Sequence, residues 1–155
     1  MEWSKTVPEW TVFNMSRSLD FYTRVLGFRV VYKREGPLFA YLDLDGVQLM
    51  LEEFHENGWN TGQLEPPYGR GINIQMEVCD VSSVLSAISD NGIALYRNLT
   101  ESWYPVEDVQ ETGQLEFLVR IRTVIFCVSP RSWKPEIEPD GPPPQSDLIR
   151  SAFRT

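Results

Sequence analysis

The sequence predicts an α+β fold built from two consecutive βαβββ modules. Three observations indicate this fold: a short helix between two strands in residues 10–32, a hairpin signal at Asp45-Gly46, and the same order of elements starting again at Ile72. A length of 155 residues suits one domain with a sizeable core. We therefore expect one domain over residues 1–128, with modules at about 7–53 and 71–128.

The first module is centred on a short amphipathic helix between the extended runs 10–13 and 28–32. Asn14 or Ser16 can cap the start of this helix, and Gly27 can adopt the left-handed conformation that ends it. One face of the helix carries the apolar residues Met15, Leu19, Tyr22, Val25 and Leu26. This spacing predicts that the face is buried against a sheet.

Two more strands complete the first module. A turn at residues 35–37 leads into a strand at 38–43, and Asp45-Gly46 is a strong signal for a tight hairpin into a strand at 47–51. Residues 54–70 are rich in Gly, Pro, Asn and Glu and are predicted to form a connector.

The second module repeats this order. Residues 72–78 alternate as a half-buried strand does, Asp80 can cap a helix, and Asn91-Gly92 can end it. Three strands are then predicted, at 93–97, near 103–106 and at 114–119. The helix has one apolar face, made of Val81, Val84, Leu85 and Ile88.

The run Leu26-Gly27-Phe28 between a helix and a strand, together with the repeated module, resembles the vicinal oxygen chelate superfamily. That superfamily includes glyoxalase, extradiol dioxygenases, fosfomycin-resistance enzymes and bleomycin-resistance proteins. The resemblance implies curved mixed sheets, and paired modules that close a cavity, usually across a homodimer.

The end of the chain departs from this family. Relatives commonly follow a run like Gly113–Phe117 with an Asp-Pro-Asp-Gly turn and a last strand, whereas this chain continues with residues 121–129 of different sequence. Restoring one base after the Arg120 codon would let the next codons read Asp-Pro-Asp-Gly-Tyr-Leu-Leu-Arg-Phe. We therefore expect an atypical C-terminal strand, a Pro-rich tail at 129–155, and translation of residues 121–155 out of the ancestral frame. A natural extension is the alternative, and residues 123–128 are apolar enough to replace the lost strand.

Composition limits the partners of the protein. A hydrophobic content of 42% and a charged content of 23% are typical of globular domains. A net charge of -8 argues against nucleic acid and leaves room for a cationic ligand. We find no membrane span and no signal peptide, so a cytoplasmic location is expected. Cys79 and Cys127 lie in apolar runs and are predicted to be buried thiols.

The expected metal positions of the family lack metal ligands. Counting back from each helix places the first-strand histidine positions on Val7 and Asn73, neither of which supplies an imidazole. The single histidine, His55, is predicted to be a solvated loop residue, and no nucleophile has an evident base. These observations predict a protein without a metal or other cofactor.

The remaining features are similar to the bleomycin-resistance branch, whose members bind a flat cationic ligand without a metal. The resemblance implies an aromatic and acidic ligand site at a dimer interface, with stacking and cation–π attraction as its mechanism. The candidate residues are Phe39, Tyr41, Trp103, Tyr104, Trp59 and Glu101.

Alternatives remain for the residues and for the function. Each aromatic can instead pack in the core or an interface, and Glu111-Thr112 stand where the branch tends to have an aromatic. The chain can also be a metal-dependent lyase or dioxygenase with a non-standard site, or a relic without activity.

Overall fold

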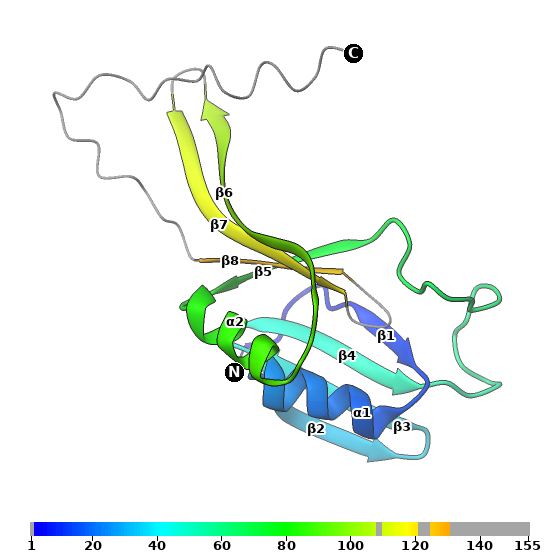
Figure 1. Ribbon diagram of the computed structural model, residues 1–155. Helices are drawn as coiled ribbons and strands as arrows, with labels where there is room; N and C mark the ends of the chain where they lie inside the picture. The colour runs from blue at the N-terminus through cyan, green and yellow to red at the C-terminus, as the bar shows by residue number, and fades with distance from the viewer. Residues whose placement is uncertain (1, 108–109, 121–124, 131–155) are drawn as a thin grey trace, which may run out of the picture.

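The computed structural model describes residues 2–107, 110–120 and 125–130, which form two four-stranded sheets with their helices (Figure 1). The first module contains β1 (Glu9–Val12), α1 (Met15–Asp20), a π-helical turn η1 (Phe21–Val25), β2 (Arg29–Glu35), β3 (Leu38–Leu44) and β4 (Val47–Glu53). The second contains β5 (Asn73–Val78), α2 (Val81–Asp90), β6 (Leu95–Glu107), β7 (Gln110–Arg120) and β8 (Ile125–Pro130).

Both sheets have the same topology. The strand order is β1-β4-β3-β2 in the first sheet and β5-β8-β7-β6 in the second. In each sheet the first strand of the module runs parallel to the last, and the other pairs are antiparallel. The predicted fold class, two βαβββ modules with mixed sheets, is confirmed.

The ends of both helices follow the predicted chemistry. The Asn14 side chain accepts a hydrogen bond from the Arg17 backbone N–H at 2.8 Å, and the Asp80 carboxylate accepts one from the Ser82 backbone N–H at 2.9 Å. Gly27 and Gly92 follow the two helices with φ of 84° and 63°. These caps fix where each helix begins and ends.

The spacing predicts one regular helix, but only its first part is α-helical. The Thr23 hydroxyl donates to the Leu19 carbonyl at 2.7 Å, and the Leu26 backbone N–H donates to the Phe21 carbonyl, five residues earlier, at 3.1 Å. A side-chain hydroxyl bound to the carbonyl one turn earlier disturbs the regular ladder, because both donors compete for one oxygen. The second half of the helix is therefore the wider turn η1.

The second module differs from the prediction in its strands. The separate strands expected at 93–97 and 103–106 are one long strand, β6, because its ladder with β7 runs from Leu95 opposite Val119 to Glu107 opposite Gln110. Register shifts along the ladder absorb the irregular sequence between them. Figure 1 shows β6 and β7 extending together away from the first sheet.

The atypical strand predicted at the end of the domain is present as β8. It lies between β5 and β7, with Asn73 opposite Ile125 in the parallel ladder and Phe117 opposite Val128 in the antiparallel one. Residues 131–155 of the predicted tail lie outside the described residues, so the frame shift stays a prediction.

A single hydrophobic core joins the two modules. Trp10 and Leu51 of the first module belong to the same buried cluster as Met76, Ile88 and Phe117 of the second. This shared core means that neither sheet is packed independently of the other. Cys79 lies outside the cluster at the end of β5 and is exposed, so its predicted burial was wrong.

Candidate ligand-binding site

The first sheet has a second side, opposite the shared core, which we call its outer face. Alternation along β3 sends Ala40 and Leu42 into the core, and Phe39, Tyr41 and Asp43 to the outer face. All five side chains are buried. Phe39 and Tyr41 therefore share a face, as the sequence predicted.

Four aromatic residues pack together on the outer face, and we call them the aromatic array: Trp3, Tyr32, Phe39 and Tyr41. The Tyr32 ring stacks on Phe39 at 5.5 Å and on Tyr41 at 5.7 Å between centroids. Trp3 meets Tyr41 edge to face at 4.9 Å. Trp3 is 57% exposed and Tyr32 42% exposed, whereas Phe39 is only 3% exposed. The rings available to a ligand are thus Trp3 and Tyr32.

Hydrophobic periodicity does not indicate that Tyr32 belongs to this site. Strict alternation would place Tyr32 on the same side as Val30, which packs against the core. The register of β2 shifts between Val30 and Tyr32, so Tyr32 stands opposite Tyr41 and turns to the outer face. Trp3 precedes the first strand, where no periodicity could indicate its position.

The segment carrying Trp3 is held by one buried amide. Gln48 accepts hydrogen bonds from the Tyr41 hydroxyl at 2.7 Å and from the Ser4 backbone N–H at 2.8 Å, and its amide donates to the Glu2 carbonyl at 2.7 Å. Burial, with the nearby Tyr32 and Asp43, raises the pKa of Tyr41, so its hydroxyl stays protonated and remains a donor. Gln48 thereby fixes the position of Trp3 beside the array.

Arginines already pair with much of the negative charge on the outer face. Arg29 lies 2.7 Å from Asp43, and Arg34 lies 3.2 Å from Glu52. The Arg34 guanidinium also sits over the Phe39 ring, 4.0 Å from its centroid. Tyr32 and Arg34 therefore both contact Phe39, which supports the array more than it presents a ring to solvent.

The predicted residues of the second module lie on the β6–β7 hairpin. The Trp103 indole donates to the Glu101 carboxylate at 3.1 Å. The Tyr104 hydroxyl donates to Glu116 at 3.0 Å, and Ser102 donates to the same carboxylate at 2.9 Å. Glu116 is the buried group that orients Tyr104. It lies in the run Gly113–Phe117 that resembles the family, but sequence reasoning missed its role because the run does not indicate its hydrogen-bond partners.

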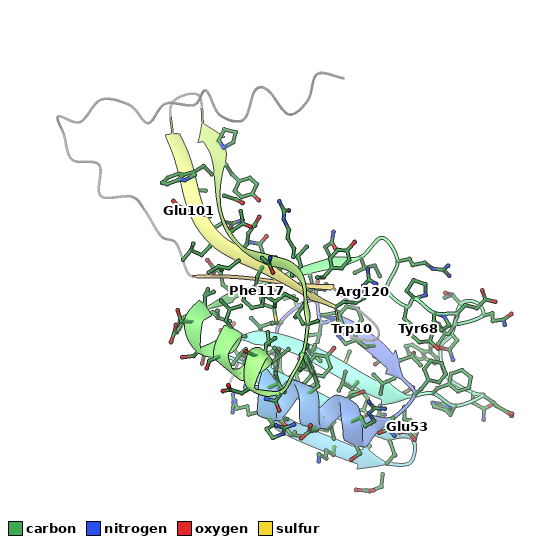
Figure 2. All side chains as sticks on the ribbon, in the orientation of Figure 1. Trp10, Glu53, Tyr68, Glu101, Phe117 and Arg120 are labelled. Carbon is green, nitrogen blue, oxygen red and sulfur yellow. The ribbon has the colours of Figure 1, made fainter. Side chains whose placement is uncertain are left out.

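The predicted site residues thus form two groups on different sheets. Phe39 and Tyr41 meet through Tyr32 on the first sheet, and Trp103 contacts Glu101 on the second. Figure 2 shows Glu101 on the part of the hairpin that projects away from the first module. Trp59 belongs to neither group, since it lies in the connector and is 96% exposed.

The donor set does not suit the divalent metal used by other members of the predicted superfamily. Val7 has no donor atom, and Asn73, the first residue of β5, is exposed. His55 is half-buried and lies 3.0 Å from Glu52, which corrects the prediction of a solvated histidine. Within the part of the chain that the structure describes, no three His, Cys, Asp or Glu side chains are grouped as metal ligands.

Comparison with known families identifies the fold. Residues 9–103 match the model of the Glyoxalase/Bleomycin resistance protein/Dioxygenase superfamily, which is more than half of the chain. The chain belongs to this superfamily. The match spans the first module and the second as far as Trp103, so both copies of the repeat contribute to it. No curated protein matches the chain.

Three solved structures are similar to the chain. A superfamily member from Vibrio splendidus is 30% identical, with 82% of this chain and 97% of that chain covered, at a TM-score of 0.38. TioX from a Micromonospora species is 17% identical, covers 82% and 98% of the two chains, and has a TM-score of 0.62. A member from Sphaerobacter thermophilus is 16% identical, covers 82% and 97%, and has a TM-score of 0.53. The last two show the shared fold.

Proposed function

We propose that this superfamily member is a metal-free binding protein that sequesters a planar aromatic ligand carrying a cationic group. The observation that carries the proposal is the aromatic array, in which two exposed rings, Trp3 and Tyr32, are backed by the buried rings Phe39 and Tyr41. A fixed set of rings can stack on a flat ligand at a low cost in entropy, because the rings are already ordered.

In this proposal, aromatic stacking contributes more to the free energy of ligand binding than ion pairing does. A stacked aromatic pair contributes about 0.5 to 1.5 kcal/mol beyond its burial, whereas an exposed ion pair contributes about 0 to 1 kcal/mol. Asp43 and Glu52 already pair with arginines, so a cationic ligand gains little from them. The preference for a cation then depends on ring faces and on the overall negative charge of the protein.

The proposal includes a homodimer in the cytoplasm. Trp103, Tyr104, Glu101 and the connector residue Trp59 would meet the outer face of a partner subunit, since they lie away from the array of their own chain. None of the helices in the described ranges is long and apolar enough to cross a membrane. The proposed partner is a small molecule, because the aromatic array is the observation that carries the proposal. Neither nucleic acid nor membrane is part of the proposal.

A second candidate is a metal-dependent lyase or dioxygenase with a non-standard site. The pair of His55 and Glu52 on the outer face is the observation that favours it, because imidazole and carboxylate are the ligand types these metals use. Elemental analysis that finds one equivalent of tightly bound zinc, iron, manganese or nickel would favour this candidate over sequestration.

Binding of the planar cation proflavine tests the main proposal. We expect Tyr32→Ala and Phe39→Leu each to weaken binding about threefold to tenfold in calorimetric titration, because the first removes a ring that stacks on the ligand and the second removes the buried ring that holds Tyr32 in place. Glu101→Gln should weaken binding less and should reduce its sensitivity to salt, because surface attraction is screened and stacking is not. Tyr96→Ala, which removes an exposed ring from β6, is the matched control.

Two outcomes would contradict the proposal. One is binding by Tyr32→Ala and Phe39→Leu that equals the wild type. The other is a larger loss from Glu101→Gln than from either ring substitution. Thermal unfolding of each variant shows whether the fold is retained, so a loss of binding can be separated from a loss of structure.

A further inference from the structure

A groove of about 860 Å³ lies on the helix side of the molecule, away from the aromatic array. It runs along α1 and η1 to the end of α2, and Arg120 at the end of β7 borders it. Its volume falls within the range of about 300 to 1,000 Å³ that small-molecule sites occupy. None of the predicted site residues lines this groove.

One wall of the groove is aromatic. Phe13 and Tyr68 stack at 5.2 Å between centroids with 28° between the ring planes, and Phe54 stacks on Phe13 at 5.2 Å. Phe13 is 50% exposed, and Val25 and Ile93 also line the groove. A flat apolar ligand can therefore find both a ring and aliphatic surface here.

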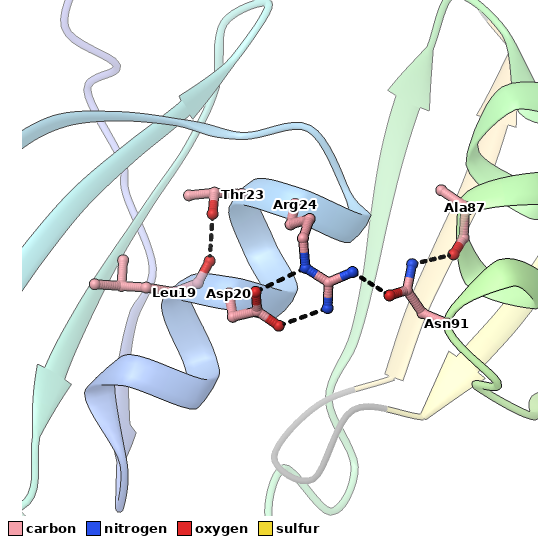
Figure 3. A network of polar contacts seen from close by, with 6 residues as sticks. All are labelled: Leu19, Asp20, Thr23, Arg24, Ala87 and Asn91. Carbon is pink, nitrogen blue, oxygen red and sulfur yellow. Dashed lines mark hydrogen bonds and ion pairs between the residues drawn. The ribbon is translucent and has the colours of Figure 1, made fainter.

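The groove is basic although the protein is acidic. Arg17, Arg24 and Arg120 line it, with Asp20 as the one carboxylate. Asp20 binds Arg24 through two hydrogen bonds of 2.8 Å, so their charges compensate (Figure 3). Arg24 also donates to Asn91, whose amide donates to the Ala87 carbonyl at 2.7 Å.

The other two arginines of the groove are not neutralised in this way by a carboxylate of the described residues. Neither Arg17 nor Arg120 has a carboxylate partner among residues 2–107, 110–120 and 125–130, and Arg120 instead sits over the Tyr96 ring at 4.4 Å. These two arginines make the groove locally positive and complementary to an anion, although the net charge of the whole chain is -8. A guanidinium is well suited to a carboxylate, which it can bind through two parallel hydrogen bonds.

We infer that this groove is a second ligand site, which takes a small aromatic carboxylate. The ring of the ligand lies against Phe13 and Tyr68, and its carboxylate pairs with Arg17 or Arg120. This site is independent of the proposed function, because it uses different residues and the opposite ligand charge.

Calorimetric titration with 2-naphthoate and its neutral isostere 2-naphthamide tests the inference. We expect 2-naphthoate to bind more tightly than 2-naphthamide. The double variant Arg17→Gln with Arg120→Gln should lose about tenfold in affinity for 2-naphthoate and less than about twofold for 2-naphthamide. Arg97→Gln, an exposed arginine of β6 outside the groove, is the matched control and should behave as the wild type.

The inference is overturned if the two compounds bind equally, if neither binds, or if the double variant binds 2-naphthoate as tightly as the wild type. Should the double variant not fold, Arg17→Gln alone carries the test, because Arg17 is exposed on the helix surface. Phe13→Leu adds a second readout, since it should weaken both compounds alike. Proflavine binding to the same variants should not change, which separates this site from the aromatic array.

Discussion

The register of β2 shifts between Val30 and Tyr32, and the contacts of the outer face depend on this shift. Without it, Tyr32 would point toward the core and Phe39 would lose one of its two covering groups. With it, an exposed tyrosine joins two buried aromatic residues into one surface. A bulge of this kind is a common device for re-aiming one side chain.

Glu9 on β1 should make the free energy of unfolding depend on pH to a measurable extent. Burial first, and the neighbouring Glu52 second, raise the pKa of Glu9. The folded protein therefore binds more protons here than the unfolded chain, so this contribution to the free energy of unfolding decreases as the pH rises above the ordinary glutamate pKa of about 4.3. We expect Glu9→Gln to become more stable relative to the wild type as the pH rises, by less than about 1 kcal/mol because the side chain is largely exposed.

Urea unfolding of both proteins at one pH below and one pH above the ordinary glutamate pKa measures the effect. Glu65→Gln, in the exposed connector, is the charge-matched control and should show no such change. A difference between Glu9→Gln and the wild type that does not depend on pH would show that Glu9 is not responsible.

Residue-level predictions from sequence succeeded where the cause is local. Asn14 and Asp80 cap helices because their side chains reach backbone groups two or three residues away. Tyr41 shares a face with Phe39 because strands alternate. Tyr32 and Glu116 could not be predicted, since a register shift and a set of hydrogen bonds across two strands decide their positions.

At the scale of elements, the arrangement of β8 is the most informative feature. It is the only strand hydrogen-bonded to β5 in the ranges that the structure describes. Parallel pairing uses backbone N–H and C=O groups, which almost any sequence supplies. This explains physically how a segment translated out of the ancestral frame could still close the second sheet, while the DNA sequence beyond the Arg120 codon tests whether it is.

Shortened chains test the importance of β8. A chain ending after Pro130 should keep the urea midpoint of the full protein, because residues 131–155 have the composition of an unstructured tail. A chain ending after Arg120 should lose cooperative unfolding or precipitate, because β5 is left without a partner and the shared core loses a neighbouring strand. Equal midpoints for the two shortened chains would contradict this prediction.

Periodicity predicted most elements but misjudged the long hairpin. The polar stretch between residues 97 and 103 breaks the hydrophobic alternation of β6, and the sequence therefore suggested two strands. The ladder to β7 continues through it because backbone hydrogen bonds do not require apolar side chains. Hairpin pairing thus overrode a local pattern.

For the whole molecule, a homodimer is the central prediction. Trp3 and Tyr32 on the first sheet, and Trp103 and Tyr104 on the hairpin, are each between 41% and 57% exposed. Large exposed aromatic residues in groups are typical of interfaces. Light scattering at micromolar concentration should give twice the chain mass of 17.9 kDa.

A charged substitution locates the interface. Tyr32→Glu should shift the population toward monomer, because a buried carboxylate without a partner is costly. Asn57→Glu, which adds the same charge to the exposed connector, should leave the dimer unchanged. A monomeric wild type, or a dimer insensitive to Tyr32→Glu, would count against pairing through the outer face.

The repeat, and with it the fold of the whole chain, was predictable because each copy has a capping Asn or Asp before its helix and a Gly after it. The spatial arrangement of the predicted site residues could not be predicted in the same way. The family resemblance assigns positions along a strand, but it does not give the distance between two sheets. In the structure, Phe39 and Trp103 lie on different sheets of the same chain.

Dependence of β5 on β8 also sets an order of events during protein synthesis. The strands of the first sheet are all made once Glu53 has been added, whereas β5 must wait from Val78 until Pro130 for its ladder. At about 5 to 20 residues per second, that wait lasts several seconds. Throughout it, the growing chain carries an unpaired strand beside a half-completed core, and ribosome-bound chains shorter than 130 residues should be cut by protease in their second half.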